Sequence, residues 1–198
     1  MSQLYHAPPS ILHLENLEKL EIYKAHPDLR VPLGVRSAFP KVSISVRDRA
    51  PTSIDAQEGS EHTYTPDQLS SEERSALKRI LVEADNASLE TIRIVDLAGT
   101  TYAHVANVMD YSVIVVDSNT KKVTGLVLER AGMKRLPTSV GKLRNLAYLD
   151  VQGNEIERVP ESIGNLKQLF YLNLGYNRLS ELPEALGGLK GLETLELY

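Results

Sequence analysis

Three aspartates in the middle of this 198-residue chain, Asp96, Asp110 and Asp117, could form a carboxylate site if they converged in the fold. Such a site would bind a metal ion or perform acid–base chemistry, but the sequence places no partner acid, base or nucleophile at a fixed spacing from them. The histidines have neither the H-E-x-x-H nor the H-x-x-E-H spacing of a zinc site. They are His6, His13, His26, His62 and His104. We therefore expect surface residues, with no catalytic residue, metal ion or cofactor.

The run I-V-D-L-A-G at residues 94–99, followed by V-I-V-V-D at 113–117, resembles the D-x-x-G strand end of nucleotide hydrolases. Those enzymes also need a loop that holds phosphate, and the G-x-x-x-x-G-K-[S/T] pattern occurs nowhere in the sequence. We interpret the run as a strand and a turn. A nucleotide-binding or hydrolytic middle region, residues 67–118, is the least favoured hypothesis.

Composition is typical of a globular chain, with 42% hydrophobic and 24% charged residues. A net charge of −4 argues against binding to nucleic acid through phosphate contacts. The absence of cysteine excludes disulfides, thiolate catalysis and cysteine-ligated zinc. No apolar run reaches the length of about 18 residues that spans a bilayer, and the first residues do not form a signal peptide. We expect no membrane contact and a cytoplasmic location.

One pattern recurs every 23 residues in the second half of the chain. It reads L-x-x-L-x-L-x-x-N-x-L-x-x-L/V-P-x-x-I/L-G-x-L, and a fixed period of this length indicates a repeat architecture. Three complete copies begin at Val123, Leu146 and Leu169, and a fourth begins at Leu192. Prolines inside each copy exclude one long amphipathic helix.

Each part of the pattern has a physical role. The L-x-L alternation predicts a short strand with leucines on one face. Asn154 and Asn177 follow the strand, where an inward amide can bind backbone groups that the turn leaves unpaired. The P-x-x-I/L-G-x-L segment is too short for a long helix, and predicts a turn or two of α or 3₁₀ helix. One repeat cannot bury its apolar side alone, so the copies must stack.

These residues resemble the leucine-rich repeat superfamily, and the wording L-P-E-x-L-G-x-L at 182–189 resembles its bacterial and plant intracellular type. The resemblance implies an α/β fold, a right-handed solenoid. It also implies a non-catalytic protein-binding role, because most members of this superfamily are binding modules.

The first half contains weaker signals. Residues 1–46 match the repeat spacing imperfectly, and N-L-E-K-L-E-I-Y at 16–23 resembles G-L-E-T-L-E-L-Y at 191–198. Phe39, Val42 and Ile44 would form the next strand, 22 residues after Leu17, Leu20 and Ile22. Residues 47–66 are polar and predict a linker, residues 67–119 a capping segment, and residues 120–198 the regular repeats.

Within the capping segment, Ser70 and Glu73 predict the start of a helix that ends near residues 85–86. Leu77, Ile80 and Leu81 supply its apolar side, and strands are expected at 91–97 and 112–116. The order helix, irregular stretch, hairpin, first repeat resembles the N-terminal cap of plant-type leucine-rich repeat proteins. The stretch from Val115 to Leu128 is the part of the sequence on which this resemblance rests.

The outward residues of the strands are the candidate binding site, because a solenoid displays them in columns on its concave face. Tyrosines there favour an interface, and carboxylates favour a basic partner. The candidates are Val127, Glu129, Tyr148, Asp150, Gln152, Tyr171, Asn173, Tyr176, Thr194 and Glu196. They are also residue types that ordinary exposed strands contain.

The C-terminal repeat has no covering segment after it in the sequence. If Tyr198 is joined to Met1 on paper, the repeat phase continues into the N-terminal residues, so that Pro8 takes the place of Pro160. An alternative function is therefore a structural protein whose copies stack head to tail, the C-terminal repeat of one on the N-terminal repeat of the next.

Overall fold

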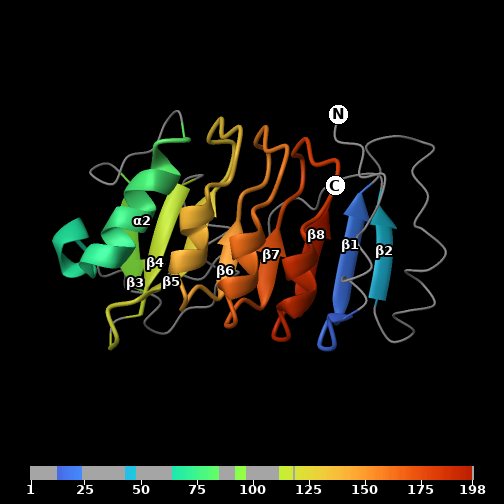
Figure 1. Ribbon diagram of the computed structural model, residues 1–198, viewed down its shortest axis with the longest axis horizontal. Coiled ribbons are helices and arrows are strands. Elements are labelled where there is room, and N and C mark those ends of the chain that lie inside the picture. Colours follow the sequence, from blue (N-terminus) through green and yellow to red (C-terminus); the bar gives the residue numbers. More distant parts are fainter. Residues whose placement is uncertain are drawn as a thin grey trace.

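The computed structural model describes residues 13–23, 43–47, 64–84, 92–96, 112–117 and 119–197. These residues form two layers, a continuous sheet and a row of short helices on one of its faces (Figure 1). The sheet has the strand order β2-β1-β8-β7-β6-β5-β4-β3. The α/β class predicted from the sequence is confirmed.

The strands are β1 Lys19–Tyr23, β2 Ser43–Arg47, β3 Arg93–Asp96, β4 Ser112–Val116, β5 Val123–Leu128, β6 Tyr148–Asp150, β7 Tyr171–Asn173 and β8 Thr194–Leu197. The helices are α2 Ser71–Leu81 and the 3₁₀ segments η2 Pro66–Gln68, η3 Thr138–Lys142, η4 Glu161–Asn165 and η5 Glu184–Gly188. The three segments η3, η4 and η5 are the short helices that the repeat pattern predicts.

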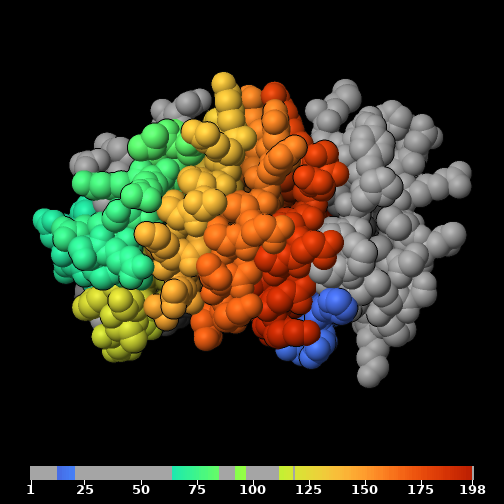
Figure 2. All heavy atoms as spheres, in the orientation of Figure 1, coloured from blue at the N-terminus to red at the C-terminus, as the bar shows by residue number. Residues whose placement is uncertain are grey.

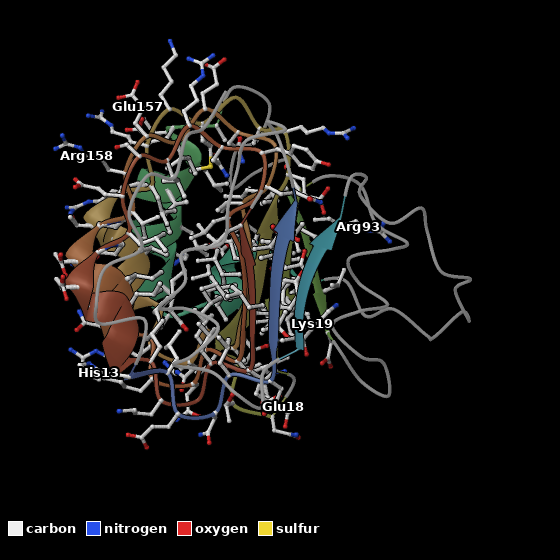
Figure 3. The ribbon with its side chains drawn as sticks, turned by 90° about the vertical axis from the view of Figure 1, so that its right-hand side faces the viewer. His13, Glu18, Lys19, Arg93, Glu157 and Arg158 are labelled. Atoms are coloured by element: carbon white, nitrogen blue, oxygen red, sulfur yellow. The ribbon has the colours of Figure 1, made fainter. Side chains whose placement is uncertain are left out.

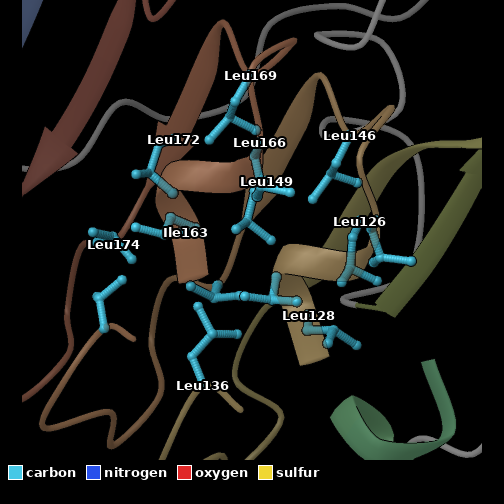
Figure 4. Packing of buried hydrophobic residues seen from close by; sticks show 14 of the residues in the cluster. Leu126, Leu128, Leu136, Leu146, Leu149, Ile163, Leu166, Leu169, Leu172 and Leu174 are labelled. Atoms are coloured by element: carbon cyan, nitrogen blue, oxygen red, sulfur yellow. The ribbon is translucent and has the colours of Figure 1, made fainter. Parts of the chain in front are cut away.

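Strands β5 to β8 pair in parallel with a constant offset of 23 residues, the period of the sequence. Gly125 lies beside Tyr148, Tyr148 beside Tyr171, and Tyr171 beside Thr194. The intervening leucines point into the space between the sheet and the helices, where they stack from repeat to repeat (Figure 4). Leucine side chains such as Leu149 are 0% exposed. Burying each one stabilises the fold by about 1.5–3 kcal/mol.

Asparagine side chains hold the turns after the strands, as predicted. The Oδ1 atom of Asn154 accepts a hydrogen bond from the backbone N–H of Met133 at 3.1 Å. Its Nδ2 atom donates to the carbonyl of Leu128 at 2.7 Å. Asn177 makes the equivalent bonds one repeat further on. Each asparagine therefore joins its own turn to the turn of the preceding repeat.

The helical row is closely packed because glycine recurs in it. Prolines in extended conformation precede η3, η4 and η5. A Cβ atom on Gly141 of η3 would lie 2.4 Å from the carbonyl oxygen of Ser162 on η4. One on Gly164 would lie 2.7 Å from the Cβ of Ala185 on η5. Only glycine allows consecutive segments to approach so closely.

Helix α2 begins where the Ser70–Glu73 pair predicts. The Ser70 hydroxyl oxygen accepts from the Glu73 N–H at 3.3 Å and donates to the Glu73 carboxylate at 2.6 Å. The predicted end is wrong: the helix ends at Leu81, and residues 85–86 lie outside the described part. The backbone bonds of Glu83 and Ala84 reach back only three residues, which tightens and ends the helix.

Helix α2 buries its predicted apolar side against the core, with Leu77 and Ile80 fully buried. Its Glu73 is buried too, and the Oε1 atom accepts a hydrogen bond from the backbone N–H of Val123 at 3.0 Å. The helix is therefore attached to the start of β5 and lies beside η3, at the β3 end of the sheet (Figure 1).

Strand β4 has the predicted limits, and β3 spans 93–96 within the predicted 91–97, whose end residues lie outside the described part. Strands β4 and β5 form an antiparallel hairpin. Asp117 sets its turn, because its carboxylate accepts from the backbone N–H groups of Asn119 and Thr120. The pKa of Asp117 is lowered, chiefly by the bond from Thr120.

The edge of β8 is not open, which corrects the expectation of an uncovered C-terminal repeat. Strand β1 pairs with β8 in parallel, with Lys19 beside Thr194. Residues 13–20 lie against the last repeat (Figure 2, blue beside red). The N-terminal segment covers this edge because its leucines continue the apolar layer; Leu14, Leu17 and Leu20 belong to the core.

Strand β2 departs from the predicted spacing. It pairs with β1 so that Ile44 lies beside Leu20, an offset of 24 residues rather than 22. The two offsets differ by two residues, which is one full period of a strand. Phe39 and Val42 lie outside the described residues.

Candidate binding face

The face of the sheet that looks away from the helices is called the strand face here (Figure 3, right-hand side, with Lys19 and Arg93 on it). Its residues alternate with the inward leucines along each strand. On β3 to β6 it contains a second apolar cluster, separate from the main core, with Phe170 and Tyr171 packed against it. The buried members of the cluster are Val95, Val113, Val115, Val127 and Tyr148.

Two tyrosines lie side by side on this face. Tyr148 and Tyr171 are register partners on β6 and β7. Their rings are parallel, with centroids 4.2 Å apart. Parallel strands with an offset of one period bring them together, because identical positions in consecutive repeats become neighbours. The result is a continuous aromatic surface, buried at Tyr148 and partly exposed at Tyr171.

A polar row crosses the next positions of β6 and β7. Asp150 is only 2% exposed, and its Oδ1 atom accepts from the Gln152 N–H at 3.0 Å. Its Oδ2 atom accepts from Asn173 Nδ2 at 3.0 Å. Asn173 in turn accepts from the Gly175 N–H at 3.0 Å. These bonds fix both side chains at the carboxyl ends of their strands.

Burial governs the ionisation of this row. It raises the pKa of Asp150 to about 8, and the charge of Glu129 adds to the rise. Burial also raises the pKa of Glu129. The pKa values of Tyr148 and Tyr171 are raised mainly by burial, so both phenols stay protonated at neutral pH. Asp150 is therefore a carboxyl group whose protonation changes near neutral pH.

The ten predicted residues form one continuous group on β5 to β8 and at the strand ends, but they differ in accessibility. Four are buried: Val127, Tyr148, Asp150 and Asn173. Five are partly exposed: Glu129, Gln152, Tyr171, Thr194 and Glu196. Tyr176 is 47% exposed and has a positive φ of 51°. Four of the six accessible residues thus lie on or after β7 and β8, and the other two, Glu129 and Gln152, follow β5 and β6.

The apolar cluster on β3 and β4 was not predicted from the sequence. The signal was present, because β4 is apolar at consecutive positions from Val113 to Val116, and a strand of that kind is buried on both faces. Glu73 was predicted to cap its helix, and its bond to Val123 was not foreseen. No local pattern could reveal an acceptor fifty residues away in the sequence.

The structure describes two of the three carboxylates considered for chemistry. Asp96 ends β3 and is buried, Asp117 sets the hairpin turn, and Asp110 lies outside the described residues. Of the five histidines only His13 is described, and residues 97–99 of the D-x-x-G run are outside as well. Within the described ranges, no group of three potential metal ligands occurs.

A surface pocket of about 520 Å³ lies apart from the strand face, between the end of α2 and η3. Val82 contributes to its lining and is 81% exposed. Glu83 and Arg135 meet there, with the guanidinium Nε atom 2.8 Å from the carboxylate. This pair bridges α2 and the first repeat.

In the comparison with curated proteins, no sequence matched this chain. Among solved structures, a leucine-rich repeat protein of Leptospira interrogans aligns with 24% identity and a TM-score of 0.32. That alignment covers 43% of this chain and 31% of the other protein.

No helix in the described residues is long and apolar enough to cross a membrane.

A family profile described as a leucine-rich repeat region matches residues 84–198, more than half of the sequence. Parallel strands at the same 23-residue period occupy the matched segment. The chain therefore belongs to the leucine-rich repeat family.

Proposed function

We propose that this chain is a non-catalytic protein-binding module that uses the strand face of a right-handed solenoid. The stacked pair Tyr148 and Tyr171 is the observation that supports the proposal most. A rigid aromatic surface loses little conformational entropy on binding, and tyrosine is enriched among the residues that dominate interface energies.

The accessible side of that surface defines where a partner would bind. Tyr171 is partly exposed on β7, and Thr194 lies beside it on β8. Glu196 lies two residues further along β8, and Tyr176 is exposed in the turn after β7. The buried residues Tyr148 and Asp150 support this patch from one side. We expect the partner to contact the β7–β8 part of the strand face, with β6 as its rigid base.

The charge of the face favours a basic partner. Burial is the main cause of the raised pKa of Asp150, and the nearby charges of Glu129 and Glu196 add to it. A lysine or arginine side chain placed near Glu196 would relieve this repulsion. Opposite charges across an interface increase the association rate and the selectivity between partners.

Binding can be tested with peptides graded in lysine and arginine content and with protein partners recovered by pull-down. Tyr171→Ala and Glu196→Gln should each weaken binding to a basic partner, and added salt should weaken it further. Glu157→Ala is the matched control, because Glu157 is exposed on the other side of the molecule (Figure 3). Equal affinities for all three variants and the unaltered chain would contradict the proposal.

The segment 67–119 is proposed to be the cap of the repeat array. Helix α2 covers the core beside the first repeat with Leu77 and Ile80, and the hairpin β4–β5 continues the sheet. A terminal repeat without such a cover would expose its apolar cross-section. Leu77→Asp should therefore expose the end of the array and promote aggregation, which light scattering would detect; the exposed Lys78→Asp is its control.

Head-to-tail stacking is the alternative function. The observation in its favour is the β8–β1 pairing, because it shows that the N-terminal segment fits the last repeat. Sedimentation velocity over a wide range of concentrations tests this alternative. A strict monomer at the highest concentration would contradict it.

A further inference from the structure

The ring of Tyr171 is stacked on one side only. Tyr148, its register partner on β6, covers that side with parallel ring planes and a centroid distance of 4.2 Å. Because the rings are stacked across the strands, the other side of Tyr171 looks toward β8, where its register partner is Thr194. Threonine has no ring, and both residues are partly exposed. The row of rings therefore ends at Tyr171, beside the short side chain of Thr194.

The described side chains leave that side of the ring without a cation. In this part of the chain the ammonium group that lies over a tyrosine is that of Lys121, 4.7 Å from the ring centroid of Tyr64. Lys19 lies beside Thr194 on β1, one strand further from Tyr171, and nothing among the described residues joins its ammonium group to the Tyr171 ring. The position above Thr194, called the ring gap here, is therefore accessible to a side chain of another molecule.

Negative charge lies beside the ring gap. Glu196 is two residues beyond Thr194 on β8, so its side chain leaves the same face of the sheet, and it is partly exposed. Burial is the main cause of the raised pKa of Tyr171, and the nearby Tyr148, Asp150 and Glu196 add to it. The carboxylate of Glu196 is thus close enough to the phenol to act on it. A cation in the ring gap would have an aromatic face on one side and a carboxylate within reach.

The spacing of the strands favours a planar cation. Neighbouring strands are about 4.8 Å apart, so a group above Thr194 lies within the distance of about 6 Å at which a cation interacts with a ring face. The guanidinium group of arginine is planar, is weakly hydrated and can give a carboxylate two parallel hydrogen bonds. The ammonium group of lysine is compact and strongly hydrated, and it has no plane that could extend the stack.

We propose that the strand face recognises an arginine side chain of its partner, which fills the ring gap, stacks on Tyr171 and binds the carboxylate of Glu196. The proposal rests on the proposed function above and names the group of the partner that the face selects. It differs from a general preference for basic partners, because charge alone does not distinguish arginine from lysine.

Peptides of equal length test this selectivity by calorimetric titration. They consist of glycine, serine and a pair of lysines, with arginine, lysine or citrulline at one central position; citrulline keeps the planar end of arginine without its charge. We expect the arginine peptide to bind about two- to fivefold more tightly than the lysine peptide, and the citrulline peptide to bind most weakly. Equal affinities for the arginine and lysine peptides would overturn the proposal.

Substitutions at the ring gap locate the selectivity. Thr194→Trp fills the gap with a ring of the chain's own and should abolish the advantage of the arginine peptide. Glu157→Trp adds the same ring on the other side of the molecule (Figure 3) and should leave the advantage intact. Tyr171→Leu keeps an apolar side chain without an aromatic face, so the arginine and lysine peptides should bind it equally. This last variant decides the result if circular dichroism shows that Thr194→Trp does not fold, and an advantage retained in Tyr171→Leu would overturn the proposal.

Failure of this proposal can be told apart from failure of the proposed function. If the arginine and lysine peptides bind equally, or neither binds, while Tyr171→Ala and Glu196→Gln still weaken a protein partner, the arginine selectivity is wrong and the binding face stands. If both variants also leave the affinity of that partner unchanged, the proposed function fails as well.

Discussion

The carboxylate of Glu73 accepts the backbone N–H of Val123 at 3.0 Å, and so joins the capping helix to the first strand of the regular repeats. Both groups are buried. A glutamate is seldom buried without partners, and here Ser70 and Lys122 provide the others. This buried side chain therefore strengthens a junction that the apolar side of α2 and the Glu83–Arg135 pair also hold together.

Replacing that side chain should destabilise the protein. Glu73→Ala leaves the Val123 N–H buried and unpaired, which costs about 1–3 kcal/mol. Glu73→Gln keeps an acceptor oxygen and should cost less. Urea unfolding measures both, with the exposed Glu72→Ala as control. Equal stabilities for Glu73→Ala and Glu72→Ala would contradict the assigned role.

The asparagine turns predict a second stability effect. Asn154→Ala removes the acceptor for the Met133 N–H and the donor to the Leu128 carbonyl, so we expect a loss of about 1–3 kcal/mol. Asn165→Ala, at an exposed position, should change the free energy of unfolding by less than about 0.5 kcal/mol. Thermal and urea unfolding would show the difference, and a neutral Asn154→Ala would argue against the turn bonds.

Glycine in the helical row makes a steric prediction. A methyl group on Gly141 would clash with the backbone of Ser162, which cannot turn away as a long side chain can. We expect Gly141→Ala to destabilise the protein by about 1–3 kcal/mol. At Gly191 the nearest atom to an added Cβ lies 3.5 Å away, so Gly191→Ala is the matched control. A crystal structure or unfolding curve of Gly141→Ala without any displacement or loss would refute this packing.

Asp150 predicts a pH dependence. Its pKa in the folded state is raised to about 8, above the value of about 3.9 in an unfolded chain, so the native state binds more protons between these values. The stabilising contribution is complete below about pH 4 and is lost as the pH rises through about 8. The free energy of unfolding should therefore fall across this window.

The variant Asp150→Asn isolates that effect. Its free energy of unfolding should fall less steeply with pH than that of the unaltered chain. The slope is the diagnostic quantity, because the new amide faces Asn173 Nδ2 and changes the absolute stability as well. Asp117→Asn is the control, since the lowered pKa of Asp117 affects stability only at acid pH. Parallel slopes between pH 5 and 9 for all three chains would contradict the assignment.

Local patterns predicted a large part of the fold. The 23-residue period indicated the parallel strands, the prolines indicated short helices, and Asn154 and Asn177 indicated the turns, because each signal acts between residues that are close in sequence. Ser70 likewise located the start of α2. What the sequence could not predict is non-local, such as the pairing of β1 with β8 inside one chain and the bond from Val123 to Glu73.

The sequence predicted which residues lie on the strand face more accurately than it predicted how deeply each of them is buried. Alternation identified which residues leave the main core, and the structure brings them together on β5 to β8. It could not predict that Tyr148 and Asp150 would be buried, because burial depends on everything that packs against a face. Whether a partner binds there stays a prediction.

The pairing of β1 with β8 also bears on the order of folding. Strands β5 to β8 join residues 23 positions apart, whereas the Lys190–Glu15 contact joins residues 175 positions apart. The entropic cost of loop closure increases with the length of the loop, and contacts between distant residues form slowly. We expect strands β5 to β8 to pair first, as a local folding nucleus, and β1 to pair with β8 last. In the interval the unpaired edge of β8 is a template for aggregation, so the rate of that final docking sets how long the newly made chain stays vulnerable.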